Sequence, residues 1–179
     1  MSVKCLIYCT KSKPYISYDS YDNKIWETDR EYSLNGKIVA QFDCEKIEEI
    51  ENNLLLIEYN FYVDFKTKSL CNTQLYEKSC LCDKDLLDYL LYKNGYAIHI
   101  SNLKIFDKPL SFKTDYIYKD YKTNAILTKA PQNMCNVYDR FGNHYVLISI
   151  KPEYVAKILN GEKTIEVRRK ILNCLKDLI

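Results

Sequence analysis

A lysine, a carboxylate and an arginine stand close together near the end of this 179-residue chain, and these side chains could do chemistry. Lys163, Glu166 and Arg168 follow Gly161 with the spacing G-x-K-x-x-E-x-R. In a strand, the side-chain period of two would place Thr164, Glu166 and Arg168 on one face. In a cleft, Lys163 and Arg168 could bind a phosphate or a carbonyl group of a ligand, and Glu166 could hold a cation or move a proton. The simpler alternative is a solvent-exposed ion pair between Glu166 and Arg168, which would contribute little to the stability of the fold.

The elements that must position these side chains are predicted over residues 146–170. Residues 146–150 are largely apolar and indicate a buried strand. Pro152 suits the first turn of a helix, because the N–H that proline lacks would have no partner there. Gly161 is expected to end this helix in a left-handed conformation, and residues 164–169 form the second strand. The helix presents one apolar face, which carries Val155, Ile158 and Leu159.

Short secondary-structure elements are predicted along the rest of the chain. Residues 54–63 could be a strand or another buried segment, which the apolar pattern does not decide. Asp83 is placed to cap a helix that ends at Gly95. Asp43 could cap a short helical turn that runs to Ile50. Further strands are expected at residues 3–9, 36–42 and 96–106.

Loops and turns complete this interpretation. Residues 11–35 are polar and rich in tyrosine, so a long loop or insertion is expected there. Residues 110–129 are also loop-like, and Gly142 is placed in a turn before the final strand. We find no linker rich in serine or glycine. The pattern therefore predicts one α+β domain over residues 1–179, built as a small mixed β-barrel, closed or nearly closed, with flanking helices.

Composition limits the environment of the chain. The net charge is only +2, so no global polycation argues for nucleic acid, although residues 151–170 are basic on balance. We expect no membrane segment and no secretory leader, because no apolar run is long enough and the first residues lead straight into a strand. The eight cysteines are then expected to be thiols in a reducing, cytoplasmic compartment.

The cysteines and histidines give only a weak metal signal. Cys80 and Cys82 form a C-x-C pair, but no second pair stands at zinc spacing, and His99 and His144 lie far away in the sequence. Cysteines that pack as small apolar groups are the favoured interpretation, with no metal and no cofactor. His99 lies within the apolar strand at 96–106, where a hydrogen-bonded structural histidine is a simpler interpretation than a catalytic base.

The octet from Gly161 to Arg168, GEKTIEVR, resembles the G-x-K-x-x-E-x-R motif of the ASCH domain, a family within the PUA-like β-barrel superfamily. The preceding LISIKPEYVAKIL resembles the first strand and helix of that family. Other segments resemble the rest of the domain, but in rotated order: CLIYCTKSKPYI, NGKIVAQFDCEKIEEI, the helix and strand from residue 79 to residue 112, and KAPQNM. The motif, which normally comes first, comes last here.

This order suggests a circularly permuted ASCH domain. Residues 171–179 would then lie close to the strand that begins at Val3, since neighbouring termini make such a rearrangement tolerable. Two alternatives remain. In a domain-swapped dimer, the motif segment of one chain would complete the barrel of another. Residues 146–179 could also be a truncated second copy of the domain.

The resemblance implies an RNA or modified-nucleoside ligand in a cleft beside the motif. One bacterial branch of the family is an amidohydrolase that acts on N4-acetylcytidine, and another is reported to be a ribonuclease. Lys163 matches the motif lysine of the amidohydrolase branch, whereas Glu166 occupies the position of its catalytic threonine. If the chain is an enzyme, Lys163 and Glu166 are the expected catalytic residues. The expected ligand-binding residues are Gly161, Lys163, Thr164, Glu166, Arg168, Tyr8, Thr10 and Gln132.

Three functions therefore stand as hypotheses from the sequence. The first is a binding module of the ASCH type for RNA or a nucleoside. The second is a hydrolase that acts on a modified base or on RNA. The third is an interaction protein, encoded by a phage, in which the cleft has become structural. The glutamate at the position of the catalytic threonine favours binding.

Overall fold

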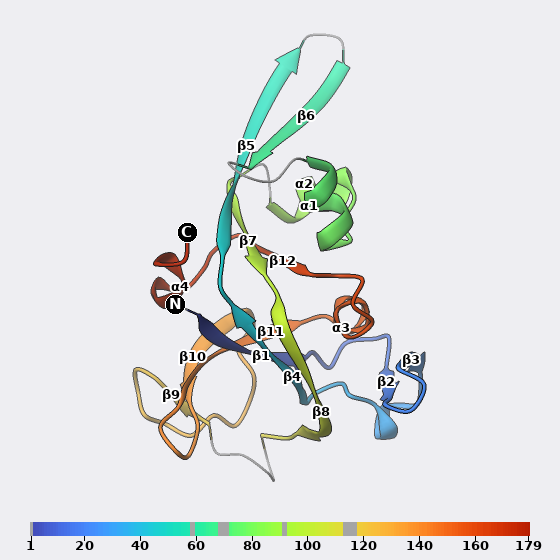
Figure 1. The fold of residues 1–179 in the computed structure, drawn as a ribbon, viewed down its shortest axis with the longest axis vertical. Coiled ribbons are helices and arrows are strands. Elements are labelled where there is room, and N and C mark those ends of the chain that lie inside the picture. Colours follow the sequence, from blue (N-terminus) through green and yellow to red (C-terminus); the bar gives the residue numbers. More distant parts are fainter. Residues whose placement is uncertain (1, 58–59, 68–71, 91–92, 113–117) are drawn as a thin grey trace.

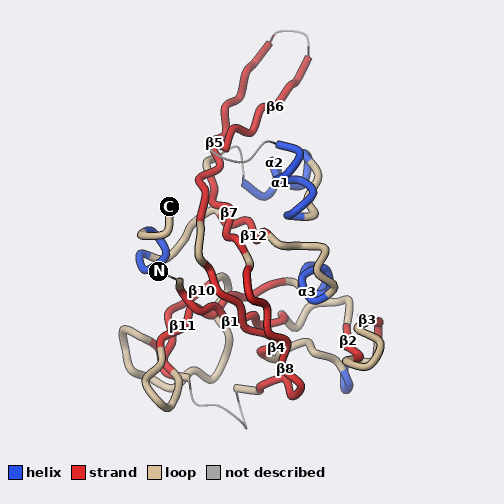
Figure 2. Tube along the Cα trace, in the orientation of Figure 1, coloured by secondary structure: helices blue, strands red, loops and turns tan. Residues whose placement is uncertain are grey.

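A computed structural model describes residues 2–57, 60–67, 72–90, 93–112 and 118–179. Strands predominate and the helices are few and short, which confirms the predicted α+β class (Figure 2). Over these described ranges the strands form open sheets and no closed barrel is present. Within the same ranges, no helix is long and apolar enough to span a membrane.

A six-stranded sheet forms the base of the molecule. Its centre is a parallel pair, in which β1 (Val3–Cys9) runs beside β11 (His144–Ile150). All other neighbours in this sheet are antiparallel. The order of the sheet is β8 (Ser101–Leu110), β4 (Ile38–Cys44), β1, β11, β10 (Met134–Tyr138) and β9 (Lys119–Asp120).

A second, antiparallel sheet carries the motif strand at its edge. Its order is β12 (Ile165–Arg168), β7 (Gly95–His99), β5 (Ile47–Ile57) and β6 (Asn60–Thr67). The chain passes from one sheet to the other three times, from β4 into β5, from β7 into β8, and from β11 through a helix into β12. Figure 1 shows these crossings, and it shows the β5–β6 hairpin extending beyond the rest of the molecule.

Short helices cover the sheets. Two of them, α1 (Asn72–Ser79) and α2 (Asp83–Leu90), lie beside the second sheet (Figure 1). The helix α3 (Pro152–Leu159) connects β11 to β12, with Pro152 in its first turn as predicted. Gly161 follows with φ of +77°, which confirms the expected left-handed end of this helix. The chain finishes in α4 (Asn173–Lys176).

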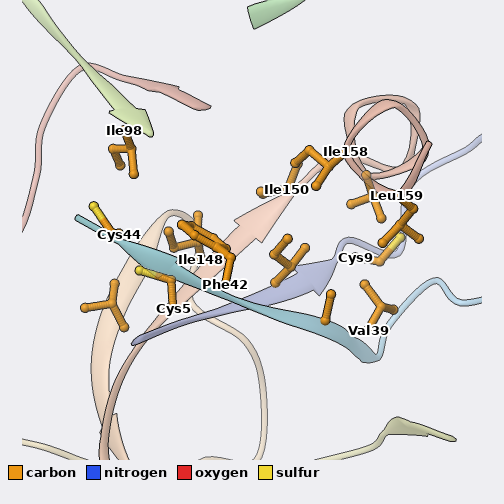
Figure 3. Close-up of a cluster of buried hydrophobic side chains, with 14 of the residues drawn as sticks. Cys5, Cys9, Val39, Phe42, Cys44, Ile98, Ile148, Ile150, Ile158 and Leu159 are labelled. Atoms are coloured by element: carbon orange, nitrogen blue, oxygen red, sulfur yellow. The ribbon is translucent and has the colours of Figure 1, made fainter. Parts of the chain in front are cut away.

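The largest apolar cluster lies between the six-stranded sheet and α3. Figure 3 shows Phe42 and Ile148 packed with neighbours from β1 and β4, while Ile158 and Leu159 approach from α3. Cys5, Cys9 and Cys44 belong to this cluster as buried thiols, and burial raises the pKa of Cys9 to about 12. These three cysteines therefore pack as small apolar groups, as predicted.

A second cluster joins β12 to the helical pair. Its members come from both helices and from the sheet: Ile50, Leu75, Leu86, Leu90, Ala97, Ile165 and Val167. Leu86 and Leu90 are fully buried in this cluster, so α2 presents an apolar face to the sheet.

Several predicted elements were wrong or incomplete. The helical turn from Asp43 to Ile50 is absent, because this segment is strand at the end of β4 and in β5, where Ile47 pairs with Ile98. The expected loop at residues 11–35 contains a hairpin of β2 (Ile16–Asp19) and β3 (Lys24–Glu27), followed by a 3₁₀ turn, η1 (Arg30–Tyr32). Neither α1 nor β10 was predicted from the sequence.

The two ends of the chain lie close together, as expected (Figure 1). Val3 packs against the same buried cluster as Leu175 and Leu178. The backbone N–H of Ile47 donates to the carbonyl of Leu178 at 3.0 Å, which ties the end of the chain to β5. The motif strand β12 pairs with β7 of the same chain.

Gly95 provides a stability test of the contact between α2 and the motif strand. A Cβ atom at this position would lie 2.5 Å from Cδ2 of Leu90 and 3.2 Å from the carbonyl oxygen of Arg168. Leu90 is fully buried and cannot swing into solvent. We expect Gly95→Ala to lower the free energy of unfolding by about 1–3 kcal/mol through overpacking, measured by urea denaturation.

Gly142→Asn is the matched control for this substitution. Gly142 has φ of +83° and open space around its Cα, and asparagine tolerates that backbone conformation. The Gly142→Asn substitution should change the free energy of unfolding by less than about 1 kcal/mol. Equal stability of Gly95→Ala and the wild type would contradict the described packing of Leu90 on β12.

Candidate functional site

The alternation of β12 separates its apolar and charged side chains as predicted. Ile165 and Val167 belong to the apolar cluster under the helical pair. Glu166 and Arg168 point to the other face, and they are nevertheless buried, with exposed fractions of 6% and 7%. The predicted alternative of a solvent-exposed ion pair is therefore wrong for these two residues.

Lys163 is the most deeply buried charge of the site, at 2% exposure. Its Nζ atom donates to the carbonyl oxygens of Ser79, at 2.8 Å, and Ile165, at 2.7 Å. The Oε2 atom of Glu166 lies 3.3 Å from the same nitrogen. Burial lowers the pKa of Lys163, and the carboxylate of Glu166 opposes that shift. Three acceptors require three N–H donors, so we assign the charged ammonium.

Glu166 lies between the two cations. Its Oε1 atom is 2.8 Å from Nη2 of Arg168, while Oε2 faces Lys163. The guanidinium of Arg168 also donates to the backbone oxygen of Ser149 at 2.8 Å and to Oδ1 of Asn133 at 2.7 Å. Its Nε atom is buried, with no hydrogen-bond partner in the described part of the chain. The result is a continuous network that joins α1, β12, β11 and the segment before β10.

These side chains form part of the wall of a cavity of about 990 Å³. Exposed cations surround it: Lys93, Lys151, Arg169 and Lys170. Two carboxylates of α2, Asp85 and Asp88, lie on the helical side. Two aromatic rings contribute to the wall, and cations lie against both. Nζ of Lys163 is 5.4 Å from the ring centre of Tyr154, and the guanidinium of Arg169 is 5.5 Å from that of Tyr89.

The structure brings together five of the eight residues that the sequence analysis nominated. Lys163, Glu166, Arg168, Thr10 and Gln132 all line this cavity. Their roles toward a ligand remain predictions.

The other three nominated residues do not line it. Tyr8 is buried with Leu6 and Tyr118 in an apolar cluster of its own, because its side chain leaves the strand on the face opposite Cys9. Gly161 is exposed at the end of α3. Thr164 is exposed too, and its backbone N–H donates to the carbonyl of Lys78.

Sequence reasoning missed several cavity residues. Asn133 was overlooked although it follows the nominated Gln132, because nothing in the local pattern shows that a distant arginine will reach it. Tyr154 was overlooked because the predicted role of its helix rested on the apolar face and not on the face that carries this tyrosine. Lys93 lies within the predicted helix from Asp83 to Gly95 but beyond the observed end of α2 at Leu90, and only the tertiary fold brings it near Lys151 and Lys170.

His99 lies outside the cavity lining. Its Nε2 atom is 2.6 Å from Oε2 of Glu48, and Nζ of Lys46 is 2.7 Å from the other carboxylate oxygen. The buried carboxylate thus has a structural partner on each side, which agrees with the structural interpretation of His99.

Cys80 and Cys82 each lie close to an oxygen atom of a neighbouring residue. Cys80 Sγ lies 3.5 Å from the carbonyl oxygen of Glu162, and Cys82 Sγ lies 3.1 Å from Oδ2 of Asp85. Across the described ranges, no group of three or more His, Cys, Asp or Glu side chains is placed to hold a metal ion.

The hydroxyl groups of the cavity wall show no activated nucleophile among the described residues. Thr10 and Ser12 pair with each other at 2.9 Å. Ser149 donates its hydroxyl to the carbonyl of Pro131 at 2.6 Å, and a backbone carbonyl is not a general base. A serine or threonine nucleophile needs an adjacent base that accepts its proton, and neither pairing supplies one.

No family model matches the chain, and neither a curated protein nor a solved structure shows significant similarity to it.

Glu166→Gln tests the energetics of the network. The change removes the negative charge between two buried cations while keeping nearly the same shape. Removing one partner of a buried ion pair leaves an uncompensated charge, so we expect a loss of about 3–5 kcal/mol in the free energy of unfolding, measured by chemical denaturation.

Glu162→Gln is the matched control, because Glu162 is an exposed glutamate of the same motif whose carboxylate accepts a hydrogen bond from the exposed Asn160 at 3.3 Å. It should change stability by less than about 0.5 kcal/mol. A similar small effect for both substitutions would show that Glu166 is not buried between the cations.

Proposed function

We propose that this chain is an ASCH-type module that binds RNA or a modified nucleoside in the cavity beside Lys163, Glu166 and Arg168. The observation that carries the proposal is the joint burial of these three motif residues in the wall of one cavity. Burying a charged network costs desolvation free energy. A binding protein can tolerate that cost when the network holds polar groups in the orientation that a ligand needs.

The chemistry of the wall suits a nucleobase with an attached phosphate. The volume of about 990 Å³ lies at the upper end of the usual range for ligand pockets. The rings of Tyr154 and Tyr89 offer flat apolar surface, and the amides of Gln132 and Asn133 offer donors and acceptors for a base edge. The exposed lysines at the rim, such as Lys151 and Lys170, could contact phosphates.

Binding is favoured over hydrolysis because the expected catalytic groups are already engaged. All three protons of the Lys163 ammonium have acceptors within the protein, so it has none left to donate to a substrate. Both oxygens of Glu166 face cations. With no activated hydroxyl along the described wall, the geometry supports recognition without turnover.

The finer fold assignment is also part of the proposal. We propose that the strands correspond to those of a PUA-like domain in circularly permuted order, arranged here in open sheets and not in the closed barrel that the sequence predicted, within one cytoplasmic chain that is active as a monomer. The neighbouring chain ends support this assignment, as does the pairing of β12 with β7 of the same chain. Size-exclusion chromatography with light scattering should report a monomer, whereas a dimer would favour exchange of the motif strand between chains.

RNA binding should depend on salt through the cations at the rim. Lys151→Ala and Lys170→Ala each remove one exposed cation of the cavity rim. For a single-stranded RNA of random sequence, we expect each change to weaken binding about fivefold at 0.1 M salt and to reduce the slope of log K against log salt by about 0.7. Fluorescence anisotropy across a salt series would measure both quantities.

Lys104→Ala is the control, since Lys104 is an exposed lysine of β8 that does not line the cavity. It should leave the affinity and the slope nearly unchanged. Equal effects for all three lysines would mean that RNA binds the surface non-specifically. Release of acetate from N4-acetylcytidine, or cleavage of the RNA, would overturn the assignment as a binding module and favour a hydrolase.

A further inference from the structure

Arg168 sets the orientation of the side-chain amide of Asn133, which lines the cavity. Arg168 carries only N–H donors, and its Nη1 atom lies 2.7 Å from Oδ1 of Asn133. The opposite amide orientation would place two donors against each other. The carbonyl oxygen of this side chain must therefore face the guanidinium, and the NH₂ group must be the free end.

Both members of this contact are held in place. Nη2 of Arg168 is bound by the backbone oxygen of Ser149 and by Oε1 of Glu166. Glu166 is in turn fixed by the buried ammonium of Lys163. The backbone of Asn133 is anchored as well, because its carbonyl accepts from the N–H of Ser149 at 2.9 Å. Lys163 thus orients Glu166, Glu166 orients Arg168, and Arg168 orients Asn133.

The NH₂ group of Asn133 is available to a ligand. Asn133 is exposed and lines the cavity, and its Nδ2 atom has no partner within the described residues. Gln132 also lines the cavity, but neither end of its amide has a partner among the described residues, so the amide can rotate to offer a donor or an acceptor. Of these two adjacent amides, only Asn133 is restricted to donating.

We infer that Asn133 is a specificity-determining residue that donates its amide hydrogens to an acceptor edge of the bound base. The inference rests on the proposed function of the cavity. A fixed donor suits the carbonyl oxygens of a base such as uracil. It is less suited to adenine, because the bidentate contact of an amide with adenine also needs an acceptor for the amino group, and Oδ1 of Asn133 is already engaged by Arg168. A polar group that is built for one hydrogen-bond pattern discriminates strongly against ligands with the opposite pattern.

Asn133→Asp is the decisive substitution. A carboxylate has nearly the same shape and still accepts from Arg168, but it has no hydrogen to donate to the ligand. We expect about tenfold weaker binding of uridine and no comparable loss for adenosine, measured by isothermal titration calorimetry. Nucleosides are used because they carry no phosphate that the added negative charge would repel.

Gln132→Glu is the matched control, since it makes the same change of amide to carboxylate at the adjacent cavity residue. It should not reproduce the selective loss of uridine. An equal loss of uridine and adenosine binding in Asn133→Asp, or the same selectivity change in both variants, would overturn this inference and leave the proposed function standing. A wild-type protein that binds neither nucleosides nor RNA would overturn both.

The orienting contact can also be tested without a ligand. Asn133→Asp should keep the melting temperature of the wild type, because Arg168 retains its acceptor. Asn133→Leu should lower it by about 5 °C or more, because one guanidinium N–H is left without a partner. Equal melting temperatures for both variants would show that Arg168 does not orient Asn133, and the inference would fail regardless of the binding results.

Discussion

A buried lysine imposes the main constraint on this structure. The ammonium of Lys163 is almost fully withdrawn from water, and a charge in that position is tolerable only when its protons all have acceptors. The backbone oxygen of Ser79 supplies one acceptor from the end of α1, Ile165 supplies one from β12, and Glu166 supplies the third. Nζ of Lys163 therefore links the end of α1 to the backbone and to the charged face of the motif strand.

The network that begins at Lys163 is better explained by orientation than by stability. Apolar side chains of similar volume would fill the same space, and such replacements are often neutral or stabilising. An apolar set could not orient a guanidinium, and through it an amide, toward a cavity. The polar groups instead form a rigid series in which Glu166 positions Arg168 and Arg168 positions Asn133. This arrangement is the preorganisation that a selective binding site requires.

The sequence predicted the elements whose signals are local. Pro152 and Gly161 mark the limits of a helix through their own backbone chemistry, and the alternation of β12 follows from the period of a strand. Prediction failed where a distant segment decides the conformation. Asp43 could cap a helical turn locally, yet pairing of β5 with β7 makes the segment a strand. Asn133 is part of the site only because Arg168 reaches it across the fold, and no local pattern carries that information.

The location of the cavity follows from chain direction. Because β1 and β11 are parallel, their carboxyl ends lie side by side, and the N–H of Thr10 donates to the carbonyl of Ile150 at 2.9 Å. The residues that follow both strands, including Thr10 and Lys151, consequently line the same cavity. This juxtaposition depends on the directions of the two strands and not on which of them comes first in the chain. The proposed permutation would therefore move the motif from the start of the sequence to its end without changing the site that the motif helps to build.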